Sequence, residues 1–192
     1  MPVRRNIDAL AHAADENVTR PERRREEGTA SMHANKRVIL LALVASAVAS
    51  YPAGGVVGII AGGDWSVTIS TADLLGGAGT DLQGTYESPS NQVLLSVGGT
   101  TGPTDTWRVD VRRSDATWHE DVHLSILRTG DGAGGSVSGG LESLEILGTD
   151  TTFLSGSDDV TGIPCQLILT GISIQVPPGA YGTTVVFTVV DT

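Results

Sequence analysis

Two hydrophobic patterns divide the chain. Residues 38–49 are an uninterrupted apolar run, VILLALVASAVA, directly behind the basic pair Lys36-Arg37. Beyond Gly63, apolar residues instead alternate with polar ones, as in a half-buried strand of an antiparallel sheet. The alternation occurs in eight segments: Trp65–Ile69, Val93–Val97, Trp107–Val111, Val122–Ile126, Leu144–Ile146, Cys165–Leu169, Ile172–Val176 and Val185–Val189. We therefore predict about eight short strands.

Glycine- and proline-rich stretches separate these segments and predict the loops. They are residues 75–79, 98–103, 130–135 and 177–179. Short strands joined by such turns are typical of an antiparallel β-sandwich or a small barrel. The run Leu141–Gly148, with the sequence LESLEILG, also fits a short helix.

The apolar run at 38–49 has the features of an export signal. A basic start and an apolar centre precede Ala47-Val48-Ala49, whose small residues suit a signal peptidase. We predict that residues 32–50 are a signal peptide, or an uncleaved membrane-anchor helix, since no charge occurs between Val38 and Gly63. In both cases the basic pair keeps the N-terminal side in the cytoplasm, so the C-terminal part is extracellular or at the cell surface.

These patterns predict four parts of the chain. Residues 1–31 are a disordered leader, or an extension upstream of a true start at Met32. Residues 51–63 are a glycine-rich apolar linker or a first strand, and residues 64–192 are the β-domain. Within the linker, Val56, Val57, Ile59 and Ile60 are candidates for pairing with another subunit.

Charge narrows the range of partners. After residue 50 the chain carries four arginines against sixteen acidic side chains, a net charge of −12, and no lysine. A field of this sign argues against nucleic acid and anionic lipid as partners. Cys165 is the only cysteine, which excludes an intramolecular disulfide and favours a small buried hydrophobic residue at this position.

The end of the chain resembles a known group of proteins. Residues 176–191, VPPGAYGTTVVFTVVD, place a Pro-Gly turn and Tyr181 before a long β-branched strand. This arrangement is similar to the closing strands of immunoglobulin-like pilin and spore-coat-type secreted surface proteins. The resemblance implies an immunoglobulin-like sandwich that serves as a surface or fibre subunit without catalytic residues.

One motif suggests an alternative function. His119-Glu120-Asp121-Val122-His123 matches His-Glu-x-x-His, which on a helix holds zinc between two histidines and places a glutamate beside it. In a zinc-dependent peptidase Glu120 would be the catalytic base and Glu142 or Glu145 the third ligand. The two-residue periodicity from Val122 onward instead predicts a strand, which would separate the two histidines by ~13 Å.

Two weaker sites complete the candidates. Asp131, Asp158 and Asp159 lie in predicted turns and are possible oxygen ligands for weakly bound Ca²⁺, although their spacing is irregular. Trp118 lies at a strand entry, where an exposed indole would suit a carbohydrate-binding module.

The sequence favours an exported, non-enzymatic structural or adhesive protein. Its expected partners are further copies of itself or other surface proteins, joined by strand pairing as in a pilus-like fibre. The zinc peptidase and the carbohydrate-binding module are the two alternatives.

Overall fold

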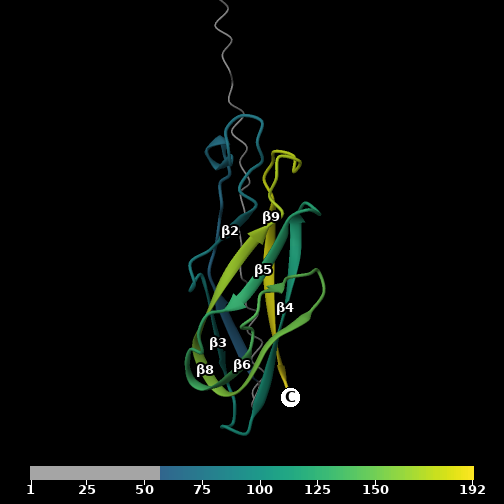
Figure 1. Cartoon of the computed structure of the whole chain (residues 1–192). Helices are drawn as coiled ribbons and strands as arrows, with labels where there is room; N and C mark the ends of the chain where they lie inside the picture. The colour runs from purple at the N-terminus through teal and green to yellow at the C-terminus, as the bar shows by residue number, and fades with distance from the viewer. Residues whose placement is uncertain (1–56) are drawn as a thin grey trace, which may run out of the picture. The chain divides into compact units, whose positions relative to one another are not determined.

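The computed structural model describes Val57–Thr192, an all-β unit. The predicted leader, the signal or anchor helix and residues 51–56 lie outside this range. The strands are β1 (Gly58–Gly62), β2 (Thr85–Glu87), β3 (Val93–Gly98), β4 (Thr106–Thr117), β5 (His123–Arg128), β6 (Ala133–Gly139), β7 (Leu144–Glu145), β8 (Thr151–Thr170) and β9 (Gly182–Asp191) (Figure 1). A single 3₁₀ turn, η1 (Thr71–Asp73), is the only helical element of the described part. None of its helices is long and apolar enough to cross a membrane.

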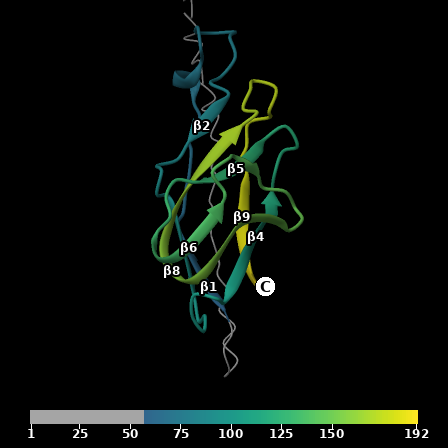
Figure 2. The same cartoon turned by 60° about the horizontal axis from the view of Figure 1, so that its bottom comes forward.

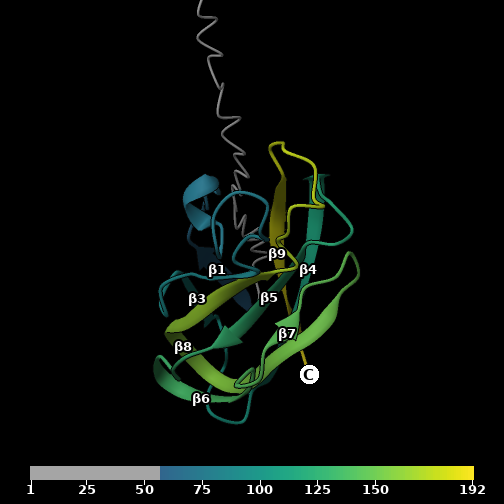
Figure 3. The ribbon, with the colours of Figure 1, turned by 45° about the horizontal axis from the view of Figure 1, so that its top comes forward.

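Strand β8 organises the sheet. Its twenty residues are paired along both edges, always antiparallel. On one edge lie β4, β3 and β2 in succession, and on the other lie β6 and β5. Figure 3 shows β8 as a long, strongly curved ribbon. The curvature coincides with Asp158, whose φ of 64° is left-handed, and with Gly162 at 69°. A break in strand geometry of this kind increases local bending and twist.

The remaining strands extend the sheet outward from this centre. β1 pairs with β3, β9 with β4, and β7 with β5. The ten-residue β9 runs beside β4 along most of its length (Figure 2). The main order of hydrogen-bonded strands is β1-β3-β8-β4-β9. Its two end strands, β1 and β9, approach each other, so the sheet nearly closes into a barrel.

Alternate residues of the strands form the core. Every second residue of β4 from Trp107 to Val111 is fully buried, and the same holds for β5 and for the second half of β8. The most deeply buried large side chains are Trp107, Ile69, Leu95, Leu124, Ile126, Ile146, Leu154, Ile163, Leu167 and Leu169. Each removes apolar area from water, worth about 1.5–3 kcal/mol per fully buried side chain.

Most segments with alternating residues form strands as predicted, but two do not. Trp65–Ile69 and Ile172–Val176 belong to no strand ladder, so these two predictions are wrong; their end residues are buried, but Ile174 is 44 % exposed. Ser70, directly after the first segment, and Ile174 of the second line the same pocket, which loops form and no strand ladder. The carboxylate of Asp81, in the loop between η1 and β2, accepts a hydrogen bond from the backbone N–H of Ile174 at 2.9 Å and joins that loop to Ile172–Val176.

The structure also contains strands that the alternation does not indicate. β6 begins at Ala133, inside the glycine-rich stretch 130–135 that we predicted to be a loop. The first half of β8 is polar and glycine-containing and was likewise not predicted. These two segments pair with each other, which satisfies the backbone hydrogen bonds of residues with little apolar surface. Of the Leu141–Gly148 run, only Leu144–Glu145 forms a strand, β7.

Candidate functional site

The His-Glu-x-x-His segment is a turn followed by a strand. β4 ends at Thr117, the N–H of Val122 donates to the carbonyl of His119 at 3.1 Å, and β5 begins at His123. The helix that the zinc-peptidase geometry requires over residues 115–128 is therefore not formed. The strand prediction from Val122 onward is confirmed for His123–Arg128.

The candidate zinc ligands have separate surroundings. His119 lies 3.7 Å from a carboxylate oxygen of Asp121, whereas His123 Nδ1 lies 2.7 Å from Glu145 Oε1 across β5 and β7. Glu120 and Glu142 are exposed in loops. Among residues 57–192, no three His, Cys, Asp or Glu side chains come close enough to hold a metal ion. The structure thus does not assemble His119, His123 and Glu142 into one site.

Trp118 is half-buried and largely engaged within its own fold. Its indole N–H donates to the carbonyl of Val122 at 2.7 Å. The guanidinium of Arg113 lies 5.0 Å from the centre of the indole ring, a cation–π contact. Arg113 is itself paired with Asp115 at 3.4 Å. One face of the ring is therefore covered, which leaves at most the other face for a sugar.

The three candidate calcium ligands are divided between two locations. Asp131 pairs with the buried Arg128 in the loop between β5 and β6. Asp158 and Asp159 lie at the bend of β8, where both accept a hydrogen bond from the Thr100 hydroxyl, at 3.2 and 2.6 Å. The Thr100 N–H also donates to Asp159, at 3.0 Å. These bonds from Thr100 hold the pKa of Asp159 below its usual value.

The candidate assembly residues fall on both faces of β1. Val57 and Ile59 are buried in the core, whereas Ile60 points outward with 61 % of its surface exposed. Val56 lies outside the described residues. In this fold Ile60 is thus the accessible one of the three described candidates.

Ile60 borders a hollow that the sequence did not reveal. The hollow has a volume of about 410 Å³ and lies on the outer face of β1, β3 and β8. Its lining residues are Gly58, Ile60, Ser96, Val97, Gly98, Gly99, Asp159 and Thr161. Gly58 and Gly98 are direct partners in the β1–β3 ladder, so at this pair neither strand places a side chain over the sheet. The only sequence signal is the alternation Gly58, Ile60, Gly62 on one face of the strand.

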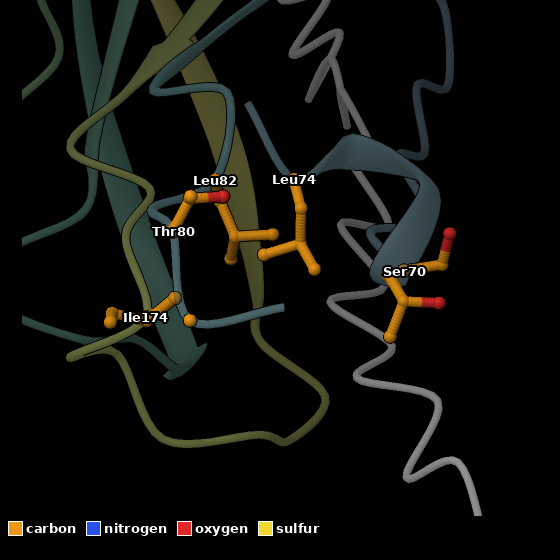
Figure 4. Close-up of a pocket in the computed structure, with 7 residues that line it drawn as sticks. Ser70, Leu74, Thr80, Leu82 and Ile174 are labelled. Atoms are coloured by element: carbon orange, nitrogen blue, oxygen red, sulfur yellow. The ribbon is translucent and has the colours of Figure 1, made fainter. Parts of the chain in front are cut away.

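A second pocket, of about 250 Å³, lies at the end of the sheet that carries η1 (Figure 4). Leu74 and Leu82 point toward one another, with Thr80 and Ile174 beside them and Ser70 on the η1 turn. The hydroxyls of Ser70 and Thr80 already donate within the fold, Ser70 to the carboxylate of Asp73 and Thr80 to the carbonyl of Gly77. The contacts of this pocket therefore serve mainly to pack the two loops together.

Comparison with protein families and with curated proteins found no match: no family model matches the sequence, and no curated protein shows significant similarity to it.

Proposed function

We propose that the chain is an exported, non-enzymatic structural or adhesive protein of the cell surface that assembles with copies of itself by strand pairing. The apolar run behind Lys36-Arg37 supports export, and the net charge of −12 after residue 50 supports a surface role without nucleic acid. We further propose an immunoglobulin-like arrangement of the strands.

The observation that carries the proposal is that the two terminal strands, β1 and β9, are each paired along one edge. Within Val57–Thr192, β1 forms a ladder only with β3, and β9 only with β4. β1 and β9 approach each other, but no ladder joins them, so each keeps N–H and C=O groups on one edge that are a template for a strand of another chain. Ile60 adds an exposed apolar side chain on β1.

The turn before β9 supports the resemblance to immunoglobulin-like surface proteins. The Tyr181 hydroxyl donates to the carbonyl of Pro177 at 2.7 Å and pins the turn of residues 177–179. Its ring packs against the core and meets the His119 ring edge-on. β9 then runs for ten residues to Asp191 as a β-branched strand.

Sedimentation velocity and electron microscopy of the exported chain test this function. We expect oligomers or filaments whose fraction rises with protein concentration. Ile60→Asp places a charge on β1 and is expected to weaken association about tenfold or more, since each 1.4 kcal/mol lost is a factor of ten. Leu141→Asp is the matched control, because Leu141 is equally exposed but lies in the loop after β6. A chain that stays monomeric at all concentrations and forms no filaments contradicts the proposal.

A further inference from the structure

The outer edge of β9 carries unused hydrogen-bonding groups at every second residue. β9 pairs with β4 from Gly182 to Asp191, and beyond it the N–H of Thr192 donates to the carbonyl of Thr106 at 3.0 Å. Residues of an antiparallel pair alternate between bonding to the partner strand and facing away from it. The even-numbered residues of β9 therefore bond to β4, and the odd-numbered ones direct their N–H and C=O groups to the other edge. No strand of the described range pairs with them there.

β9 also lies in a part of the molecule without net charge. No charged side chain occurs between Asp159 and Asp191, so β9 is uncharged up to its last residue. β4 and β9 together hold three arginines and three aspartates, namely Arg108, Arg112, Arg113, Asp110, Asp115 and Asp191. These six charges cancel, so the whole net charge of −12 after residue 50 belongs to the rest of that part of the chain.

This distribution of charge favours contact between two copies at β9. Copies with a charge of −12 repel each other, and the repulsion is weakest where the surface is neutral. The surroundings of β1, the other free edge, are acidic, because Asp159 lines the hollow next to Ile60. A contact between two β1 strands brings like charges together, whereas a contact between two β9 strands avoids this cost.

Symmetry and register restrict how two β9 strands can pair. Opposite residues of an antiparallel ladder lie on the same face of the sheet, so a symmetric ladder places one residue opposite its own copy. Val186 is the centre of the uncharged stretch Gly182–Val190 and points away from the core, since its neighbours Val185 and Phe187 are buried. A ladder centred on Val186 pairs this valine with itself and Thr184 with Thr188, and leaves Asp191 outside. Pairs of β-branched side chains suit an antiparallel sheet.

We propose that two copies of the chain join through the outer edges of their β9 strands, antiparallel and centred on Val186, into a symmetric dimer with one continuous sheet across both copies. The inference rests on the proposed assembly by strand pairing, and it names the edge and the partner of the first contact. β1 is left for a weaker contact between dimers, by which filaments grow.

A disulfide between the copies tests the register. In this ladder the even-numbered residues form the pairs without mutual hydrogen bonds, whose Cα atoms lie about 4.5 Å apart, within the range of a disulfide. Val186→Cys is therefore expected to form a covalent dimer with oxidised glutathione. Thr188→Cys is the matched control, because the two copies of residue 188 are offset by four residues, roughly 13 Å. The native Cys165 is buried and does not take part.

Charge reversal tests the symmetry. Val186→Lys and Val186→Glu each place like charges opposite each other, so we expect each to raise the dimer Kd at least about tenfold in sedimentation equilibrium. An equimolar mixture restores dimers, since the opposed charges then differ in sign, and this recovery shows that both variants are folded. Thr104→Lys is the control, because it adds the same charge on an exposed loop and leaves the dimer close to native.

A proline at Val189 tests the edge without adding charge. Residue 189 directs its N–H away from β4, so Val189→Pro removes no hydrogen bond of the β4–β9 ladder. Its ring lies where the second copy must approach, and we expect the variant to stay monomeric. Tryptophan fluorescence checks that its core is intact.

Ile60→Asp separates this inference from the proposed function, since it is expected to remove larger species and leave the dimer. Loss of the dimer in Ile60→Asp places β1 in the first contact and overturns the inference. Oligomers with an unchanged Kd in Val186→Lys and Val189→Pro also overturn it, and leave the proposed assembly standing. Faster cross-linking by Thr188→Cys than by Val186→Cys overturns the register. A native chain that is monomeric at all concentrations overturns both proposals.

Discussion

Gly156 of β8 lies directly against the indole ring of Trp107, its register partner on β4. A Cβ at position 156 would lie 2.4 Å from Cζ2 of the ring and 2.2 Å from the carbonyl oxygen of Ser136 on β6. Trp107 is fully buried, and its indole N–H donates to the carbonyl of Asp158 at 2.8 Å. The absence of a side chain at 156 therefore allows the ring of Trp107 to lie against the backbone of β8.

Gly156→Ala is expected to lower the free energy of unfolding by about 1–3 kcal/mol or more, the usual cost of overpacking a close-packed core. The added methyl meets backbone on one side and a buried ring on the other, and neither can move freely. Urea denaturation followed by tryptophan fluorescence measures the change. Gly182→Ala is the control, because a Cβ there has nothing within 4 Å. An equal effect of the two substitutions would count against the packing of Trp107 described here.

Arg128 and Asp131 form an asymmetric ion pair, since 4 % of the arginine side chain is exposed against 79 % of the aspartate. Arg128 also donates to the carbonyls of Gly139 at 2.8 Å and Gly130 at 3.3 Å, and so fixes the loop between β5 and β6. Arg128→Met is expected to cost about 3 kcal/mol, because hydrogen bonds of a buried charged group are lost. Asp131→Ala is expected to cost under about 1 kcal/mol, as for an exposed pair.

Chemical denaturation of the two variants tests this ranking. The carbonyl partners of Arg128 remain in place when Asp131 is removed, which is why the second cost is small. An Asp131→Ala variant that loses as much stability as Arg128→Met would show that the ion pair, and not the carbonyl contacts, holds the loop.

The hydrogen bonds from Thr100 to Asp159 predict sensitivity to acid. Because they hold the pKa of Asp159 below its unfolded value, they stabilise the fold above that value, near pH 4, and the stabilisation is lost as pH falls through the lowered folded pKa. Thr100→Val removes the hydroxyl donor, which is the largest cause of the lowered pKa. We expect the difference in Tm between native chain and variant to be largest above about pH 4 and to shrink toward about pH 2.

Melting curves across this pH range provide the measurement. Thr104→Val is a suitable control, since Thr104 is exposed on the same loop. A Tm difference between native chain and Thr100→Val that is constant from pH 2 to pH 6 would exclude the proposed linkage.

Cys165 is expected to be inert in the folded chain and reactive after unfolding. Its side chain is buried between β3 and β5, and burial raises the pKa of the thiol to about 12. Since the thiolate is the reactive form, a thiol reagent has neither access nor a nucleophile in the native state. Labelling in increasing urea should follow the unfolding transition seen by fluorescence. Rapid stoichiometric labelling without denaturant would contradict the burial of Cys165.

Alternation of apolar and polar residues predicted burial better than it predicted strands. Trp65 and Ile69 are buried as the pattern indicates, and so are Ile172 and Val176, although Ile174 between them is exposed; neither segment pairs. Alternation of apolar and polar residues indicates which side chains are buried. An extended loop packed on a core buries alternate residues as a strand does. Whether a segment joins a ladder depends on the backbone opposite it, which local sequence does not specify.

The candidate sites show the same limit. The spacing of His119 and His123 is fixed by the sequence, but a motif of this type acts only on a helix, and the turn at 118–122 separates the two side chains into different environments. The hollow joins Gly58, Gly98 and Asp159, which no spacing rule connects. These residues are close because β1, β3 and β8 are neighbouring strands, and the register of these strands decides which residues lie side by side.

By itself, the sequence determined the all-β antiparallel class, most of the buried positions, the burial of Cys165 and the strongly acidic, lysine-free character of the chain after residue 50. These features depend on composition and on local periodicity, because hydrophobic burial acts on each side chain in turn. Only the tertiary structure decided that a curved β8 is paired along both edges, that Gly156 makes room for Trp107, and that an ionised Asp159 faces a hollow beside Ile60. Those features depend on strand register between residues tens of positions apart, which is set by the packing of the whole sheet.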